Sequence, residues 1–403
     1  MRHSMRRTGS LRLIGALTTM LVVLSVGVSA NATTSVDNVK LTGVNGSGAS
    51  GQVHIYIWDI EDNTGFAANS VVFDTQLSNL PAIRGGGSGF YTLWVFAPTI
   101  GRQLVHTFNT NGGGVKGHHT TMFVAVLGDW VVPNVRDILL SEDVRIEIWE
   151  ESDDGVAGPD GPGLLVMSGS IFRPVGESTV PILLPGSCGD VRMDRCESLL
   201  GNVVTDSWRA TYGTDFAILN SGGVTGDLTC PISDDPDDQC PAHSPPRFDI
   251  TDGTITNANG FNNDLYTVDD VTGFELKGML EHSVSAMPTP HFRFAQLSGL
   301  CFTYDIDAVP GSRILSAVRQ GVDGACTADA INLSAAATYS MTMSVFTAGG
   351  GDGYPDFIAQ SRGQVEGNQR SDLASWVAAN TPISPTIDGR IACVGSSCPV
   401  AVP

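Results

Sequence analysis

Cysteine is missing from almost half of the 403-residue chain, because no cysteine precedes Cys188. All eight cysteines lie from Cys188 to Cys398. An even number of cysteines in an exported chain is typical of disulfide bonds, and pairing in sequence order is the simplest hypothesis. That pairing would close an acidic loop between Cys230 and Cys240. The sequence does not fix the connectivity, but the cysteine spacing and the lack of histidine at ligand spacing disfavour a metal site.

Basic residues are also scarce. The chain has 22 Lys and Arg against 42 Asp and Glu, which gives a formal net charge of −20. This charge repels a nucleic-acid backbone at long range and favours neutral or cationic ligands. We therefore expect no nucleic-acid polymer as a partner.

Long apolar runs are absent after the first thirty residues. Four arginines precede the apolar run 13–28, and Ala30-Asn31-Ala32 follows it. This order is typical of a cleavable secretory signal, so we predict a signal peptide over 1–32 and a secreted, periplasmic or cell-surface protein. An uncleaved membrane anchor is the alternative, although the run is shorter than the ~20 residues that a spanning helix needs. No transmembrane segment is expected after signal cleavage.

The region 33–174 consists of short β-rich runs that alternate with Gly, Asn, Asp and Pro turns. The clearest expected strands are 53–58, 90–96, 122–127 and 144–149. Their spacing predicts an all-β, sandwich-like N-terminal module, whose function the sequence does not indicate.

Two ligand hypotheses arise in this module. Four of the six tryptophans lie there, and an exposed row of them could stack on sugar rings, although core packing is their more common role: Trp58, Trp94, Trp130 and Trp149. A Gly/Pro-rich loop holds a weak Ca²⁺ candidate, since hard cations favour clustered oxygen ligands: Glu150, Asp153, Asp154 and Asp160. The loop spacing does not match an EF-hand, so a solvated hairpin loop is the ordinary alternative.

After this module the pattern becomes mixed. Periodicity predicts helices over 199–212, 273–285 and 371–379, and strands over 215–220, 302–305 and 340–345. We expect an α+β domain over 175–392, followed by a cysteine-containing tail over 393–403.

The order of motifs in this second half resembles the C-terminal domain of the 5'-nucleotidase family. The resemblance rests on a helix at its start, a strand with a glycine turn, a turn containing Phe261 and Asn263, and a glycine loop before Pro355. The matching segments are 197–206, 217–223, 259–263, 271–277, 280–284, 296–300, 310–313, 350–355 and 388–391. In that family the domain holds a nucleoside, with the base between two aromatic rings and a carboxylate on the ribose hydroxyls.

The resemblance assigns roles residue by residue. It implies that Phe261 and Phe346 are the two rings, that Asp352 is the carboxylate, and that Asn263 lies near the base edge. Glycine-rich backbone around Asp352 fits close approach of the main chain to a ligand. A family arginine that grips phosphate corresponds to Arg195, or alternatively to Arg192, because the register near Cys196 is ambiguous.

Two departures from the family change the expected function. Thr225 stands where the family has a second phosphate-binding arginine, which predicts weaker or altered phosphate recognition. The two-metal motifs Asp-x-His and Gly-Asn-His do not occur before Val175, and two-metal hydrolysis needs several converging ligands. We therefore expect no catalytic residues, metal or other cofactor of the chain's own.

Three functions follow as alternatives. The first is nucleoside or nucleotide recognition linked to nucleotide catabolism, with catalysis left to a possible separate partner. The second is a metal-dependent phosphoester hydrolase whose site is not recognisable in the sequence. The third is a cell-surface structural protein that binds a polymer through the tryptophan-rich module.

Overall fold

The structure is a computed structural model. It describes residues 34–44, 46–61, 67–81, 90–97, 101–108, 118–126, 139, 143–151, 164–230, 240 and 247–400. The expected signal peptide lies outside the described residues, as do Trp130, Asp153, Asp154 and Asp160. Among the described residues, no helix is long and apolar enough to cross a membrane.

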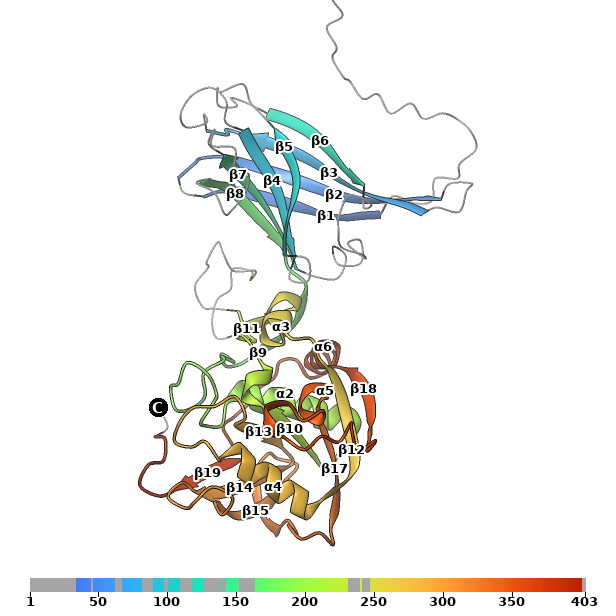
Figure 1. Cartoon of the computed structure of the whole chain (residues 1–403). Helices are drawn as coiled ribbons and strands as arrows, with labels where there is room; N and C mark the ends of the chain where they lie inside the picture. Colours follow the sequence, from blue (N-terminus) through green and yellow to red (C-terminus); the bar gives the residue numbers. More distant parts are fainter. Residues whose placement is uncertain are drawn as a thin grey trace, which may run out of the picture.

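The N-terminal part is one curved antiparallel sheet of eight strands with the order β5-β4-β7-β8-β1-β2-β3-β6 (Figure 1). The sheet curls into a half-barrel, so its two edge strands, β5 and β6, come into contact. The strands are β1 Thr34–Gly43, β2 Ser50–Glu61, β3 Ala67–Ser78, β4 Phe90–Ala97, β5 Gly101–Phe108, β6 His118–Val126, β7 Val144–Glu151 and β8 Leu164–Ile171. The all-β expectation is confirmed. The two layers of the expected sandwich-like module are the two halves of this single sheet.

Every second residue along the strands supplies an apolar side chain to the core of this sheet. Tyr91, Leu93 and Val95 of β4 are fully buried, and Ile146 and Ile148 of β7 join them in the same apolar cluster. Successive side chains of a strand point to opposite faces, so this alternation fixes which face turns inward.

The two tryptophans of this sheet whose side chains are described lie half-buried on β4 and β7. Trp149 donates a hydrogen bond from Nε1 to Glu147 Oε2 at 2.8 Å, and the Arg102 guanidinium lies 5.9 Å from the Trp149 ring centroid. Trp94 Nε1 donates to Thr92 Oγ1 at 2.9 Å. Both rings therefore have partners within their own sheet.

The second half contains mixed sheets and helices, which confirms the expected α+β class. A five-stranded sheet has the order β13-β10-β17-β12-β18, a four-stranded sheet has the order β16-β15-β14-β19, and β9 pairs with β11. The strands are β9 Pro174–Ser178, β10 Phe216–Asn220, β11 Phe248–Thr251, β12 Asp264–Thr272, β13 Ala295–Ser298, β14 Leu300–Asp305, β15 Ile314–Gln320, β16 Cys326–Ala330, β17 Thr338–Ser344, β18 Gln364–Asn368 and β19 Ile391–Val394. The helices are α2 Leu199–Tyr212, α3 Asp252–Ala258, α4 Gly273–Ser283, α5 Val345–Ala348 and α6 Gln369–Asn380, with 3₁₀ turns η2 Ser221–Gly223 and η3 Gly351–Gly353.

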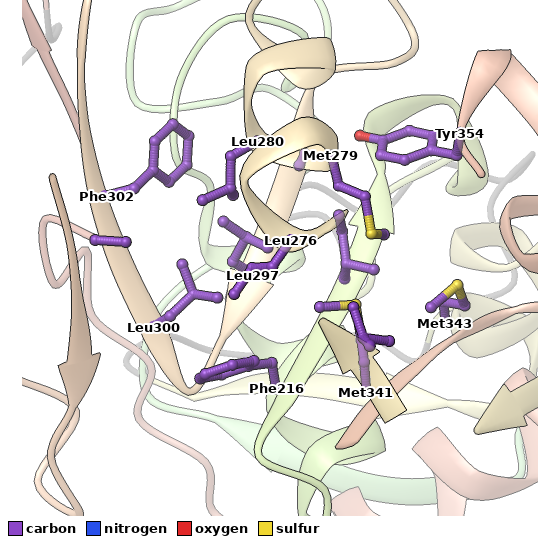
Figure 2. Packing of buried hydrophobic residues seen from close by; sticks show 14 of the residues in the cluster. Phe216, Leu276, Met279, Leu280, Leu297, Leu300, Phe302, Met341, Met343 and Tyr354 are labelled. Carbon is purple, nitrogen blue, oxygen red and sulfur yellow. The ribbon is translucent and has the colours of Figure 1, made fainter. Parts of the chain in front are cut away.

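Strand β10 separates two apolar cores. Phe216 and Ile218 face the cluster that contains Leu276 and Met279 of α4, where Figure 2 shows the packing. Ala217 and Leu219 belong to the opposite cluster, beneath α2 and α6. Every residue of β10 is buried, and the first four form a continuous apolar run rather than an alternating one.

Side-chain caps fix the helix ends. Ser198 accepts a hydrogen bond from Gly201 N at the start of α2, and Gly213 ends that helix in the left-handed region with φ 65°. Helix α4 begins with a capping box between Thr272 and Glu275. Because Val284 leaves the helical geometry, α4 ends at Ser283 instead of the expected Ser285.

The sequential disulfide hypothesis is confirmed. The four bonds are Cys188–Cys196, Cys230–Cys240, Cys301–Cys326 and Cys393–Cys398. Such bonds are typical of proteins that fold in an oxidising compartment.

Glu275 makes the stability of the domain depend on pH. The Arg362 guanidinium, whose Nη1 lies 2.5 Å from Glu275 Oε1, lowers the pKa of that carboxyl to about 2. Since the pKa is lower in the folded state, this stabilisation is present above the ordinary pKa of 4.5 and is lost as the pH falls toward 2. We expect Glu275→Gln, which can still cap α4, to destabilise the protein by about 1 kcal/mol near pH 6, because the pair is partly exposed. Urea unfolding at several pH values should show this difference shrinking as the pH falls.

The matched control is the same substitution in an Arg362→Met background. There the effect of Glu275→Gln on the free energy of unfolding should vary much less with pH, because the cation that lowers the pKa is gone. An equal pH dependence in both backgrounds would contradict the assignment to this ion pair.

Candidate functional site

A cavity of about 340 Å³ lies at the carboxyl ends of two parallel strands, β10 and β17. Neighbouring parallel strands lead into loops at the same edge of a sheet, which is where ligands bind in many α/β folds. Strand β10 leads into the glycine turn of η2, and β17 leads through α5 into the glycine loop of η3. The cavity is lined by Arg192, Asn220, Gly222, Gly223, Val224, Thr225, Phe261, Asn263, Phe292, Phe346 and Asp352.

Four of the five residues predicted from the sequence meet at this cavity. Phe261, Asn263, Phe346 and Asp352 all line it, although they come from two segments more than eighty residues apart in the chain. The fifth residue does not: Arg195 lies outside the lining and donates from Nε to Asp190 Oδ2 at 2.7 Å.

The arginine on the cavity wall is Arg192, the alternative considered for that position. Two residues separate it from Arg195, in a stretch of bends without helix or strand just before α2. In such a stretch no periodicity sets which side chain points toward a given loop. The sequence could therefore not select between the two arginines.

Asp352 is fixed in place by three neighbouring residues. Its Oδ2 accepts a hydrogen bond from Asn220 Nδ2 at 2.7 Å, and Asn220 Oδ1 accepts one from Thr347 Oγ1 at 3.2 Å. The Asp352 carbonyl oxygen lies 2.8 Å from His282 Nε2, so this ring nitrogen carries the proton and donates. The carboxylate thus has one oxygen held by Asn220, and its other oxygen can accept a hydrogen bond from a ligand hydroxyl.

Glycines in the loop permit the close contacts around Asp352. Asp352 itself adopts the left-handed region with φ 54°, and Gly350 and Gly353 flank it with φ 85° and 89°. A Cβ on Gly351 would lie 2.4 Å from Phe346 Cε1, which is far below van der Waals contact. The Phe346 ring therefore packs closely against the loop backbone, and glycine at 351 is what makes room for it.

Three exposed aromatic rings surround the cavity. Phe261, Phe292 and Phe346 keep 61%, 53% and 46% of their surface exposed. Large apolar side chains clustered at one concave site are typical of a ligand-binding surface. Phe292 was not predicted, because it stands in a turn with no motif around it and only the fold brings it to the cavity.

The charges at the cavity are balanced. Arg192 Nη2 donates to the carbonyl oxygens of Ser221 and Val224 at 3.0 and 2.7 Å, and its guanidinium lies 5.4 Å from the centroid of Phe292. Burial and the nearby Asp352 charge raise the pKa of Tyr354, so its hydroxyl stays protonated and donates to Arg293 O at 2.7 Å. The wall thus offers stacking surfaces, one carboxylate, two amide side chains and one guanidinium already held by carbonyl groups.

The calcium hypothesis concerns the other part of the chain. Glu150 is buried in β7, with 4% of its surface exposed, while its three proposed partners lie outside the described residues. Among the residues that the structure describes, no three or more His, Cys, Asp or Glu side chains are grouped so that they could hold a metal ion.

The comparisons with known proteins concern the second half of the chain. Residues 174–359 match the family described as 5'-nucleotidase, C-terminal domain. The trifunctional nucleotide phosphoesterase protein YfkN of Bacillus subtilis (strain 168) is 28% identical over 201 residues, which are 48% of this chain and 12% of that protein. Cell wall protein Lmo0130 of Listeria monocytogenes is 29% identical over 171 residues, 41% of this chain and 19% of that protein.

A snake venom 5'-nucleotidase of Gloydius brevicauda is 29% identical over 126 residues, 30% of this chain and 21% of the enzyme. The crystal structure of a 5'-nucleotidase precursor from Thermus thermophilus has 20% identity and a TM-score of 0.45, and the match covers 63% of this chain and 50% of that one. The chain thus spans less than a quarter of the length of the three curated relatives. Residues 174–359 of the chain are a 5'-nucleotidase C-terminal domain.

Proposed function

We propose that this domain binds nucleosides or nucleotides in the cavity at the end of β10. In this arrangement the base stacks between Phe261 and Phe346, the ribose hydroxyls donate to Asp352, and Asn263 contacts the base edge. The single observation that supports it most is the convergence of these four residues on one cavity, from segments far apart in the chain.

The energetics of the site favour this class of ligand. Stacking a base on an aromatic side chain contributes about 1–3 kcal/mol and accepts any base, since each has a π-face. A hydroxyl that donates to a carboxylate makes a charge-assisted hydrogen bond, which is stronger than a neutral one. The volume of about 340 Å³ falls within the range of small-molecule sites.

The proposed biological role is recognition outside the cytoplasm, linked to nucleotide catabolism. The four disulfides support export, and the change of sheet between β8 and β9 supports a division into a β module over 33–174 and a recognition domain over 175–392. The cavity wall carries binding groups rather than a set of metal ligands, so the proposal leaves hydrolysis to a separate catalytic partner.

A second candidate is a surface protein that binds a polymer. The observation that favours it is the similarity to a cell wall protein of Listeria monocytogenes over 41% of the chain. The two roles are compatible, because a nucleoside-binding domain can be presented at a surface. Only the first role assigns a ligand to the cavity.

Asp352 provides the sharpest test. We expect isothermal calorimetry to show that the mature chain binds adenosine and that Asp352→Asn weakens this binding roughly tenfold or more, because charged hydrogen bonds are worth about 1.5–3 kcal/mol. Asp356→Asn is the matched control: it makes the same change in the same loop, at an exposed residue whose Oδ1 accepts from Ala359 N. It should leave the affinity unchanged.

A ligand that lacks the ribose hydroxyls provides a second test of the role of Asp352. 2',3'-Dideoxyadenosine, which lacks the 2'- and 3'-hydroxyls of the ribose, should bind the wild type more weakly than adenosine does. The Asp352→Asn variant should bind the two ligands nearly alike, since the acceptor is altered. No binding of adenosine by the wild type at millimolar concentration would overturn the proposed function.

Gly351 tests the stacking role of Phe346. Gly351→Ala places a methyl group within the Phe346 ring position, so we expect the ring to move and adenosine affinity to fall by about fivefold to tenfold, near the lower limit of a stacking interaction. Gly278→Ala in α4, where a Cβ has no neighbour within 4 Å, is the control that should retain full affinity. Retained affinity in Gly351→Ala would show that Phe346 does not hold the base.

A further inference from the structure

In the part of the chain that the structure describes, the cavity wall carries only one cationic side chain, Arg192, and it also carries a carboxylate, Asp352, which would repel a phosphate. On the basis of the proposed function, we propose that the site selects uncharged nucleosides over nucleoside phosphates. Arg192, the glycine turn, Thr225 and the surrounding charge each support this selectivity.

Arg192 is the cation among the residues that line the cavity, and its guanidinium is already hydrogen-bonded within the protein. Its Nη2 donates to two backbone carbonyl oxygens, those of Ser221 and Val224, and its Nε lies 3.8 Å from Asp194 Oδ1. Its guanidinium also packs over the ring of Phe292. A bidentate grip on phosphate uses N–H groups of two neighbouring guanidinium nitrogens. Because Nη2 is bonded to the carbonyl groups of the glycine turn and Nε is buried, only Nη1 is left for a ligand.

The backbone of the glycine turn is also committed. A run of free N–H groups in such a turn would form a concave anion site. Here Ser221 N donates to Phe294 O at 2.8 Å, Gly222 N donates to Phe292 O at 3.1 Å and Thr225 N donates to Ala258 O at 2.9 Å. These three amide groups already have carbonyl partners in the protein, so they are not available to an anion.

Thr225 leaves the rim of the cavity neutral. Its side chain is exposed at the cavity edge, but its hydroxyl accepts from Gly260 N at 2.9 Å and donates to the carbonyl oxygen of Asn257. Thr225 thus braces the loop that carries Phe261. It helps to place an aromatic wall and contributes no charge.

The surroundings oppose a phosphate further. A monophosphate carries a charge of about −1.5 to −2 at neutral pH, and it would enter a site that contains Asp352 on a chain with a net charge of −20. Moving such an anion out of water is unfavourable when the Arg192 guanidinium on the wall is already bonded to carbonyl groups. A neutral nucleoside keeps the stacking and the hydroxyl contacts and avoids this cost.

The direct test compares adenosine with AMP on the mature wild-type chain by calorimetry at low and at physiological salt. We expect adenosine to bind at least tenfold more tightly, and AMP binding to strengthen as salt screens the repulsion. AMP binding as tight as adenosine, or weakening with salt, would overturn the selectivity and leave the proposed function intact. Binding of neither ligand would overturn the proposed function itself.

Two substitutions at the rim locate the selectivity. Thr225→Arg and Thr225→Met both replace the hydroxyl with a long, flexible side chain, but only the first adds a cation. We expect Thr225→Arg to bind AMP roughly tenfold more tightly than Thr225→Met does, in line with one charge-assisted contact. The two variants should bind adenosine equally, which also reports that the Phe261 loop is equally intact in both.

The test for Arg192 is the ratio of AMP affinity to adenosine affinity, because either affinity alone does not isolate a contact with phosphate. Arg192→Met removes the cation that packs on Phe292, so it can weaken both ligands. If Arg192 serves the glycine turn, the ratio of AMP to adenosine affinity stays at the wild-type value. A selective loss of AMP binding would show that Arg192 grips phosphate, and the inference would then be wrong.

Discussion

The side chain of Asn220 joins the sheet of the second half to the loop that forms its cavity. Asn220 is the last residue of β10, is 2% exposed, and bonds to both Thr347 and Asp352. Its amide can satisfy a hydroxyl donor and a carboxylate acceptor at once. The other features of the cavity depend on these bonds, because Asn220 holds both α5, which carries Phe346, and the loop of Asp352 against the end of the sheet.

The position of β10 explains why that anchor is stiff. The strand is buried on both faces between two apolar cores, and it pairs with β13 on one side and β17 on the other. A residue at the end of such a strand cannot move without disturbing close-packed side chains. The cavity is therefore formed by short loops on a rigid edge, and the aromatic rings around it are exposed side chains.

The sequence predicted the parts of the structure that local chemistry determines. The apolar period and the Ser198 cap gave α2 its observed limits, and the motifs around Phe261 and Asp352 identified two walls of the cavity. Helix α6 begins two residues before the expected start because the Asn368 side chain caps it, accepting from Arg370 N. Such a cap shifts a boundary without changing the periodic pattern.

What the sequence could not predict depends on contacts between distant segments. Phe292 reaches the cavity because the loop before β13 packs beside the glycine turn, where Gly222 N donates to Phe292 O. Arg192 rather than Arg195 lies on the cavity wall because the carbonyl oxygens of Ser221 and Val224, which are distant in the sequence, accept its hydrogen bonds. In the first half the strands were recognisable, but their order in one curled sheet is set by pairings such as β1 with β8, more than 120 residues apart.

The disulfides have a consequence for how the chain matures. Their partners are separated by 5, 8, 10 and 25 residues, so each bond closes within a short stretch of chain. A chain that emerges from a membrane from its N-terminus can therefore complete each bond as soon as that stretch has passed, and no bond has to wait for a distant segment. Few wrong pairings compete under these conditions, so we expect correct oxidation to require little reshuffling by an isomerase and to follow the order in which the polypeptide is delivered.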